Sequence, residues 1–321
     1  MSPPTDAPTD LRTQVDGRTL TLSNLDKVLF PSGFTKAEVI SYYVDVAPVM
    51  LPHLAGKAIT RLRFPNGTDA SSFYEKNVPA GAPDWVESIV VAASEGMISY
   101  VTARDAATLV WLANLAALEL HVPQWRVQDA PATSGTPLPL DGPGSPRSDS
   151  VVVDLDPGEG TTMVDTARAA LLVANELALD GMVPSVKTSG NKGLQVYAPI
   201  TPTPGSECVA YVRVLAERLA GRHPDRFVAV MAKAMRTDRI FVDYLQNQAG
   251  RNTIAPYSLR GRHSPGVSTP LTWDEVASVT SPDALRFSPA DVLARVRTHG
   301  DLFADILERD HAAPLPRSEE V

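Results

Sequence analysis

The segment from Val151 to Pro157 restricts the possible folds of this chain more than any other. It places three β-branched valines before two acids, Asp154 and Asp156, which are separated by one leucine. Successive side chains of a strand point to opposite faces, so we expect both carboxylates on one face, roughly 6–7 Å apart. Two like charges in a partly dry site require a divalent cation, a shared proton or a nearby basic side chain.

A second interpretation of this segment stays open. Acid pairs at strand ends are common, and Asp156 or Thr161 would then simply cap the helix that follows. The residues of the segment alone are equally compatible with both interpretations.

The segments after residue 147 predict a β-α-β-β-α-β order. Hydrophobic periodicity and capping residues favour strands at 150–155, 185–188, 194–198 and 239–244, and helices at 162–179 and 206–219. This order resembles the split βαβ arrangement of ferredoxin-like and RNA-recognition-like units, whose sheet leaves one face open.

The first half of the chain also alternates strands and helices. We expect strands at 16–22 and 58–64, a helix at 36–51 that follows Thr35, and a buried helix at 106–120. A stretch rich in Pro, Gly and Ser, 130–147, is typical of a connecting loop. The sequence thus predicts an α/β (α+β) chain with one domain at 13–310, subdomains at about 13–130 and 148–310, and disordered tails at 1–12 and 311–321.

Composition excludes several classes of protein. The 321 residues carry a net charge of −8, which argues against a general polyanion-coating protein but leaves room for a local basic cleft. Cys208 is the only cysteine, so a disulfide framework and a cysteine-rich zinc site are excluded. The sequence shows no secretory signal and no membrane-spanning apolar run, so we expect a cytoplasmic protein without membrane contact.

Asp243 ends another apolar segment and is a candidate third acid. If that strand neighbours the first, three carboxylates form a cup for two divalent ions, the arrangement used in phosphoryl transfer. Arg260 and Arg262 would then neutralise phosphate, although an Arg-x-Arg pair is also typical of a solvated turn.

The loop at 189–193 combines a hydroxyl, flexible glycines and an ammonium. Ser189 and Lys192 suit an oxyanion such as a triphosphate, and an ordinary tight hairpin with a solvent-facing lysine is the alternative. His121, beside Val122, fits a buried core residue as well as a ligand.

Cations and aromatic residues alternate near the front of the chain. Arg61 and Arg63 followed by Phe73 and Tyr74 match nucleic-acid clefts, in which cations contact phosphates and rings contact bases. A strand with one charged face explains the same residues. Lys27 and Lys36 bracket a turn and are candidates for one terminal phosphate, or are solvated lysines.

Six ordered motifs between residues 15 and 306 together resemble one family, the polymerase domain of bacterial ligase D, in the archaeo-eukaryotic primase superfamily. They are DKVLFP at 26–31, RLRFPNG at 61–67, ELHVPQW at 119–125, DLDPGEG at 154–160, SGNKGL at 189–194, and FVDY at 241–244 with PYSLRGR at 256–262. The resemblance implies a primase-like catalytic core with a mostly antiparallel central sheet, an RNA-recognition-like unit and flanking helices.

The resemblance also implies roles for individual residues. Two catalytic ions, Mn²⁺ or Mg²⁺, would be bound by Asp154, Asp156 and Asp243. The incoming NTP or dNTP would be held by His121, Ser189, Lys192, Gln195, Gln246, Arg260 and Arg262. DNA would be contacted by Lys27, Lys36, Arg61, Arg63, Phe73, Tyr74 and Arg236, with the two lysines on a 5′-phosphate, the aromatic pair on the template and Arg236 near the primer end.

The implied activity is template-directed extension and short-gap filling during double-strand break repair by end joining, with a preference for ribonucleotides. The implied partners are gapped or broken DNA with a 5′-phosphate, a Ku-like end-binder and a separate ligase, in a bacterial, nucleoid-associated setting. A non-catalytic DNA-end binder, a primase and a metal-dependent phosphodiesterase are the alternatives.

Two positions depart from the family pattern. Gln195 stands where family members usually have histidine, and an amide cannot carry charge or transfer a proton. Leu62 occupies a place where lysine is frequent, which removes one possible phosphate contact.

Overall fold

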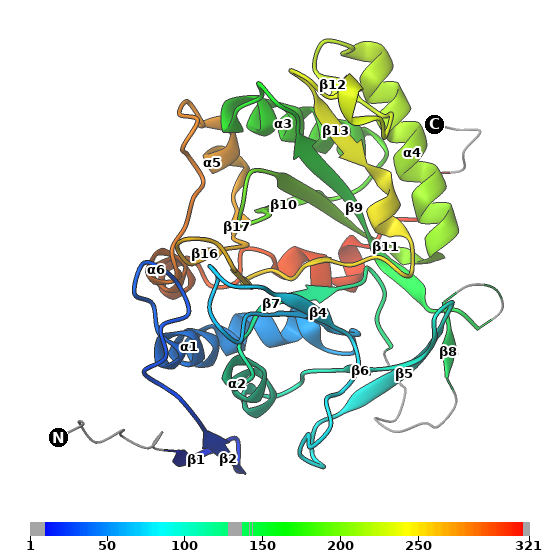
Figure 1. Ribbon diagram of the computed structural model, residues 1–321. Helices are drawn as coiled ribbons and strands as arrows, with labels where there is room; N and C mark the ends of the chain where they lie inside the picture. Colours follow the sequence, from blue (N-terminus) through cyan, green and yellow to red (C-terminus); the bar gives the residue numbers. More distant parts are fainter. Residues whose placement is uncertain (1–9, 128–136, 141, 143, 317–321) are drawn as a thin grey trace.

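A six-stranded sheet forms the centre of the second half of the chain (Figure 1). The computed structural model describes residues 10–127, 137–140, 142 and 144–316. In spatial order the strands are β12 (Phe227–Val228), β13 (Ile240–Asp243), β9 (Arg147–Pro157), β11 (Leu194–Pro204), β10 (Ser185–Thr188) and β17 (Pro270–Leu271). The four strands from β13 to β10 pair antiparallel, which confirms the β-α-β-β-α-β prediction and the mostly antiparallel sheet.

Two helices, α3 (Met163–Leu179) and α4 (Gly205–Arg222), cover one face of this sheet. Val151, Val153 and Leu155 pack with them in one hydrophobic core, together with Val196 and Val242. Because strand side chains alternate, the acids at the even-numbered positions of β9 lie on the other face. The sheet therefore keeps one face available for polar groups.

The helix α3 begins with a capping box. The Thr162 hydroxyl accepts from the Asp165 N–H while the Asp165 carboxylate accepts from Thr162. The alternative in which Asp156 or Thr161 caps this helix is wrong, and Thr161 instead donates to the Gly158 carbonyl over 2.7 Å. Asp156 is thereby left without a capping role.

The first half of the chain contains a second core around α1 (Lys36–Leu54), α2 (Ala106–Asn114) and a four-stranded sheet. That sheet has the order β14 (Thr253–Ile254), β7 (Ala117–Val122), β3 (Thr60–Arg63) and β4 (Phe73–Glu75). Later residues, including Tyr257, Leu259 and Val292, also enter this core. No helix in the described part of the chain has the length and apolar character needed to cross a bilayer.

Smaller elements surround the two cores. They are the hairpin β1 (Leu11–Val15) and β2 (Arg18–Leu22), the strands β5 (Ser88–Ala93), β6 (Gly96–Val101) and β8 (Leu138–Pro139), the hairpin β15 (Leu259–Arg260) and β16 (Gly266–Val267), and the helices α5 (Trp273–Ala277) and α6 (Pro289–His299). The described residues also form the short 3-10 helices η1 (Lys233–Met235), η2 (Tyr244–Asn247), η3 (Ala304–Leu307) and η4 (Arg309–His311).

Two predicted elements of the first half are wrong in extent. The helix predicted at 106–120 ends at Asn114, because Ala116 adopts a φ of 55° and the chain reverses into the buried strand β7. The strand predicted at 16–22 is the second arm of a hairpin, since Asp16 and Gly17 both have positive φ and form its turn.

The described parts of the expected tails pack against the fold. Leu11 and Arg12 belong to β1. Near the other end, the Ala313 N–H donates to the Pro199 carbonyl, and Thr201 N–H donates to the Ala313 carbonyl over 2.9 Å. Positions 1–9 and 317–321, and half of the predicted connection at 130–147, lie outside the described residues. The division into subdomains stays a prediction.

Candidate active site

Three carboxylates meet on the open face of the six-stranded sheet. Asp243 lies directly opposite Asp154 in the register of β13 and β9, and Asp156 lies two residues further along β9. One oxygen from each carboxylate lies within 4.8 Å of the others. The structure therefore brings together the three acids that the sequence analysis singled out.

The electrostatics of this cluster favour a cation. Burial, followed by the charge of Asp156, raises the pKa of Asp154 to about 7. Burial and then Asp243 also raise the pKa of Asp156, against the opposing charge of Arg236. Three converging carboxylate oxygens are the donors that Mg²⁺ and Mn²⁺ prefer, so the residues present fit divalent metal.

A row of polar side chains continues from the acids across the sheet. Gln195 lies opposite Asp154, and Lys187 lies opposite Gln195. The Gln195 amide donates to Asp154 Oδ1 over 3.0 Å. Lys187 is fully buried, and burial lowers its pKa to about 7 although Asp154 acts in the opposite direction. The sequence analysis missed Lys187, whose only signal is a lysine inside a short predicted strand.

A cavity of about 500 Å³ lies beside the acids. The predicted site residues that line it are Tyr74, His121, Asp154, Asp156, Ser189, Lys192, Gln195, Arg236, Gln246 and Arg260. Gln246 also donates to the carboxylate of Asp243, the third acid, over 2.9 Å. A residue of the cavity wall therefore holds this acid in place. The cavity thus combines carboxylates with cationic and amide groups from distant parts of the chain.

Glu119, which has no assigned role in the sequence analysis, organises one wall of this cavity. Its carboxylate lies 2.9 Å from His121 Nε2 and accepts from Arg260 at 2.8 Å and from the Gly261 N–H at 3.0 Å. Burial alone would raise the pKa of Glu119, but these partners together hold it below its usual value. The signal in the sequence was an acid between two leucines of a strand.

Arg61 and Arg63 point to an internal acid. The Arg61 guanidinium is fully buried and lies 3.1 Å from Glu75, and it donates to the Asn77 carbonyl. Arg63 donates to the same Glu75 over 3.0 Å. The Arg61 side chain is therefore not exposed to solvent, and the alternative of a strand with one charged face describes the segment better. A contact of Arg61 with DNA stays a prediction.

Two aromatic side chains of β4 remain exposed. Phe73 is 45% and Tyr74 65% exposed, and the Tyr74 ring lies edge-on to His121 with centroids 6.0 Å apart. The exposed ring of Tyr74 thus presents a flat apolar surface at the mouth of the cavity.

Lys27 and Lys36 lie side by side, since the Lys36 N–H donates to the Lys27 carbonyl over 2.9 Å. The Lys27 side chain is exposed, whereas Lys36 is nearly buried and donates to the Ser23 carbonyl over 2.8 Å. Burial, then the charges of Lys27 and Arg63, lower the pKa of Lys36. Lys27 therefore presents its charge at the surface, whereas the Lys36 ammonium is held by protein oxygens.

Arg262 does not line the acidic cavity. It lies in a neighbouring hollow with Gly190, Lys192 and His263. Lys192 lines both hollows, so Arg262 is adjacent to the nucleotide loop but separated from the carboxylates.

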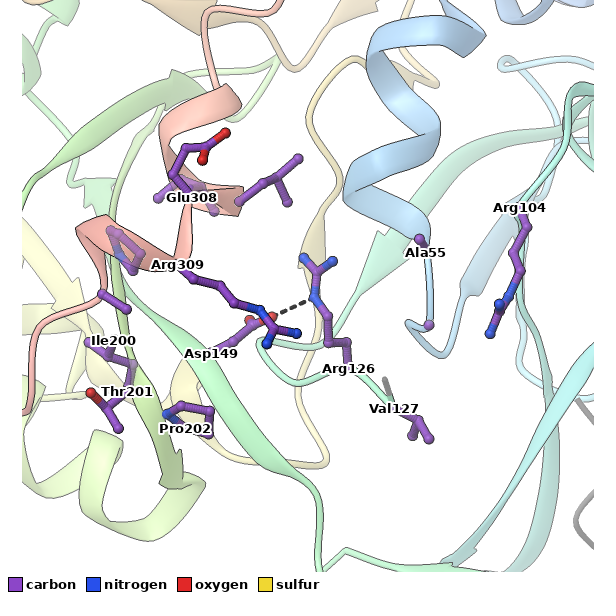
Figure 2. A pocket seen from close by; sticks show the side chains of 15 residues that line it. Ala55, Arg104, Arg126, Val127, Asp149, Ile200, Thr201, Pro202, Glu308 and Arg309 are labelled. Carbon is purple, nitrogen blue, oxygen red and sulfur yellow. Dashed lines mark hydrogen bonds and ion pairs between the residues drawn. The ribbon is translucent and has the colours of Figure 1, made fainter. Parts of the chain in front are cut away.

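A larger cavity of about 690 Å³ lies at the opposite ends of β9 and β11 (Figure 2). It contains Arg104, Arg126 and Arg309, and the Arg126 guanidinium is ion-paired to Asp149 at 2.5 Å. None of the predicted site residues lines it. The chemistry of the side chains, rather than cavity size, locates the candidate active site.

Comparisons with known proteins give one family. The family model described as "LigD, primase-polymerase domain" matches residues 35–303. The Mycobacterium tuberculosis protein "Multifunctional non-homologous end joining DNA repair protein LigD" is 42% identical over 299 residues, which are 92% of this chain and 38% of that protein. The Bacillus subtilis "Bifunctional non-homologous end joining protein LigD" is 32% identical, over 92% of this chain and 45% of that protein.

A solved structure gives the same result. The "Polymerase Domain from Mycobacterium tuberculosis Ligase D in complex with DNA" superimposes with a TM-score of 0.82 at 40% identity, covering 90% of this chain and 98% of that one. This confirms the predicted fold class. The chain spans less than half the length of these two full-length LigD relatives. With its six motifs, its antiparallel sheet and its acidic cluster, the chain belongs to the LigD primase-polymerase domain family.

Proposed function

We propose that this protein is a template-directed nucleotidyltransferase that extends a 3′ end and fills short gaps in DNA. The observation that carries the proposal is the convergence of Asp154, Asp156 and Asp243 beside a cavity lined by cationic and aromatic side chains. Membership of the LigD primase-polymerase domain family supports it.

The three carboxylates would hold two divalent ions, Mg²⁺ or Mn²⁺. When bound, such ions supply positive charge to the attacking and leaving oxygens of an in-line phosphoryl transfer. The protein keeps these carboxylates oriented through its own contacts, because Gln195 donates to Asp154 and both Gln246 and the Leu245 N–H donate to Asp243.

The incoming nucleotide would bind between the 189–193 loop and the wall formed by Glu119. Lys192 and Arg260 would attract its phosphates, and Ser189 fixes the loop by accepting from the Gly193 N–H at 3.2 Å. Glu119 holds Arg260 and His121 in place, so that this wall presents oriented donors rather than mobile side chains.

DNA would approach the exposed side of the same cavity. Tyr74 and Phe73 offer faces on which a template base can stack. Arg236 lines the cavity near Asp156 and would contact the primer end. Lys27 and Lys36 would bind the 5′-phosphate on the far side of a gap. The related mycobacterial domain has been solved in complex with DNA, which supports DNA binding by this chain.

In the cell the protein would act in double-strand break repair by end joining, as the names of its relatives state for them. Its partners would be broken DNA with a 5′-phosphate, a Ku-like end-binder and a separate ligase. In the same proposal, the protein prefers ribonucleotides and is located near the bacterial nucleoid.

One assay tests the proposal. The protein is incubated with a 5′-phosphorylated gapped duplex, Mn²⁺ and labelled ribo- or deoxyribonucleotide, and the strands are separated on a denaturing gel. Template-dependent lengthening of the primer supports a polymerase. Shortened strands indicate a phosphodiesterase, and unchanged strands with a shifted native band indicate a DNA binder. In a parallel reaction on an unprimed template, products indicate a primase.

A further inference from the structure

Four polar residues form one row across the open face of the six-stranded sheet. Each lies directly opposite the next in the strand register: Asp243 on β13, Asp154 on β9, Gln195 on β11 and Lys187 on β10. The first two belong to the proposed metal cluster. The other two extend the row away from it into the protein interior, where Gln195 is 4% and Lys187 0% exposed.

Lys187 is held by three contacts. Its ammonium donates to Gln195 Oε1 over 2.5 Å and to Ser268 Oγ over 2.9 Å, and it lies 5.5 Å from the Tyr197 ring centroid. Ser268 in turn donates to the Thr188 carbonyl over 2.8 Å. These contacts fix the lysine and offset part of the free-energy cost of burying an amine, which is large when the amine has no hydrogen-bond partners.

The donor and acceptor capacities along the row determine its direction. A lysine ammonium only donates and an ionised carboxylate only accepts, whereas an amide does both. With Lys187 donating to Oε1, the Gln195 amide has only its NH₂ group to offer Asp154, and that group lies 3.0 Å from Oδ1. A flipped amide would set its NH₂ group against the Lys187 donor and its oxygen against the carboxylate.

We propose that Lys187 is a positioning residue for metal binding. It fixes the orientation of the Gln195 amide, and the amide in turn orients Asp154 so that the remaining carboxylate lone pairs point to where the acidic cluster would bind metal. Among the described hydrogen bonds, only the one from Gln195 reaches the Asp154 carboxylate. The orientation of Asp154 therefore depends on this amide, and the orientation of the amide depends on Lys187. The inference rests on the proposed metal role of the three acids.

The test is a double-mutant cycle with direct Mn²⁺ binding as the measurement, in the absence of nucleotide and DNA. Free Mn²⁺ is followed by its electron paramagnetic resonance signal in the parent, Lys187→Met, Gln195→Met and the double variant. Methionine keeps the length and apolar volume of both side chains without their hydrogen bonds. Residues that orient a metal ligand typically change metal affinity by 10–100-fold, so we expect each single variant to weaken Mn²⁺ binding roughly tenfold.

The double variant separates positioning from general support of the sheet. If Lys187 acts through Gln195, the double variant binds Mn²⁺ as weakly as Gln195→Met alone, because that substitution already removes the amide through which Lys187 acts. Two independent effects would instead multiply to roughly 100-fold, and that result would overturn the inference. Unchanged Mn²⁺ affinity in folded Lys187→Met would overturn it as well.

Lys57→Met is the matched control. Lys57 is also a buried lysine, 6% exposed, whose ammonium donates to the Pro123 carbonyl over 3.0 Å at a place outside the acidic cavity. We expect this variant to keep the parent Mn²⁺ affinity whatever its melting temperature. A parent protein that binds no Mn²⁺ would contradict the proposed function itself, whereas parental affinity in Lys187→Met would contradict only the role of Lys187.

Discussion

Arg260 donates a hydrogen bond to Glu119 over 2.8 Å, although the two residues are 141 positions apart in the sequence. The same carboxylate is in contact with His121. A buried acid thereby holds two donors at the wall of the proposed nucleotide site, and it sets the orientation of both before any ligand binds.

Replacing this acid tests its role. We expect Glu119→Gln to lower kcat/KM for the nucleotide roughly tenfold or more, because hydrogen bonds to a charged group contribute about 1.5–3 kcal/mol and Arg260 would lose its fixed direction. Steady-state primer extension at varied nucleotide concentration measures this. Glu275→Gln is the control, since Glu275 accepts from Arg295 over 2.8 Å in α5. A parental kcat/KM in Glu119→Gln would show that Arg260 is positioned by other means.

The acidic cluster was predictable because each acid ends an apolar strand segment and the strands could be ordered by a known topology. Alternation along the 151–157 segment puts Asp154 and Asp156 on one face, and the antiparallel pairing of β13 with β9 adds Asp243. Local sequence thus contained the chemistry of the cluster, and the pairing of two strands that are distant in the sequence completes it.

Other parts of the site could not be predicted, because their partners come from distant segments. Lys187 donates to Ser268, 81 positions away, and nothing near either residue indicates the other. The burial of Arg61 was not predicted for the same reason: an arginine on a strand is expected in solvent, and only the pairing of β3 with β4 places Glu75 beside it. The helix predicted at 106–120 failed because its apolar residues fit a buried strand equally well.

Removing one acid tests the metal cluster. We expect Asp154→Asn to abolish extension of a gapped duplex with little loss of DNA binding, because the amide replaces an anionic metal ligand. Denaturing gels measure extension and fluorescence anisotropy measures DNA binding. Normal extension by this variant would contradict the metal assignment.

The same variant has a defined effect on the pH dependence of stability. In the metal-free protein the pKa of Asp154 is raised to about 7, so between about pH 4 and 7 the folded state binds more protons than the unfolded state. This group therefore lowers the free energy of unfolding as pH rises through that window, by a few kcal/mol at most since one pKa unit is about 1.4 kcal/mol. Chelator-treated Asp154→Asn should show a flatter dependence in urea titrations. A parallel slope in parent and variant would contradict this.

Tyr74 tests the proposed template contact. Stacking of one base on an aromatic ring contributes about 1–3 kcal/mol, so Tyr74→Ala should weaken binding of gapped DNA roughly tenfold. Met97→Ala is the control, because Met97 is also apolar and 63% exposed but lies on β6. Equal affinities of the two variants for gapped DNA in an anisotropy titration would contradict the proposed template contact.

Lys27 tests the proposed phosphate site. A charge-assisted hydrogen bond to phosphate contributes about 1.5–3 kcal/mol, so Lys27→Ala should reduce the preference for a phosphorylated over an unphosphorylated gap roughly tenfold. Lys76→Ala serves as the control, because Lys76 is paired with Glu95 elsewhere on the surface. Primer extension on both substrates gives the ratio, and a parent that uses both gaps equally would contradict this assignment.

Gln195→His introduces the residue expected from the family pattern and makes the polar row sensitive to pH. A neutral imidazole can accept from Lys187 at one nitrogen and donate to Asp154 from the other, as the amide does. A protonated imidazole has two donors and no acceptor, so below about pH 6.5, the usual pKa of histidine, it would oppose the Lys187 ammonium. We therefore expect near-parental extension at pH 8 and a progressive loss relative to the parent below pH 6.5, in parallel pH profiles on the same gapped duplex. A constant ratio across this range would show that position 195 does not connect Lys187 to Asp154 through hydrogen bonds. The ratio to the parent is the measurement because the pKa values of Asp154 and Lys187 both lie near 7, so these two groups titrate in both proteins.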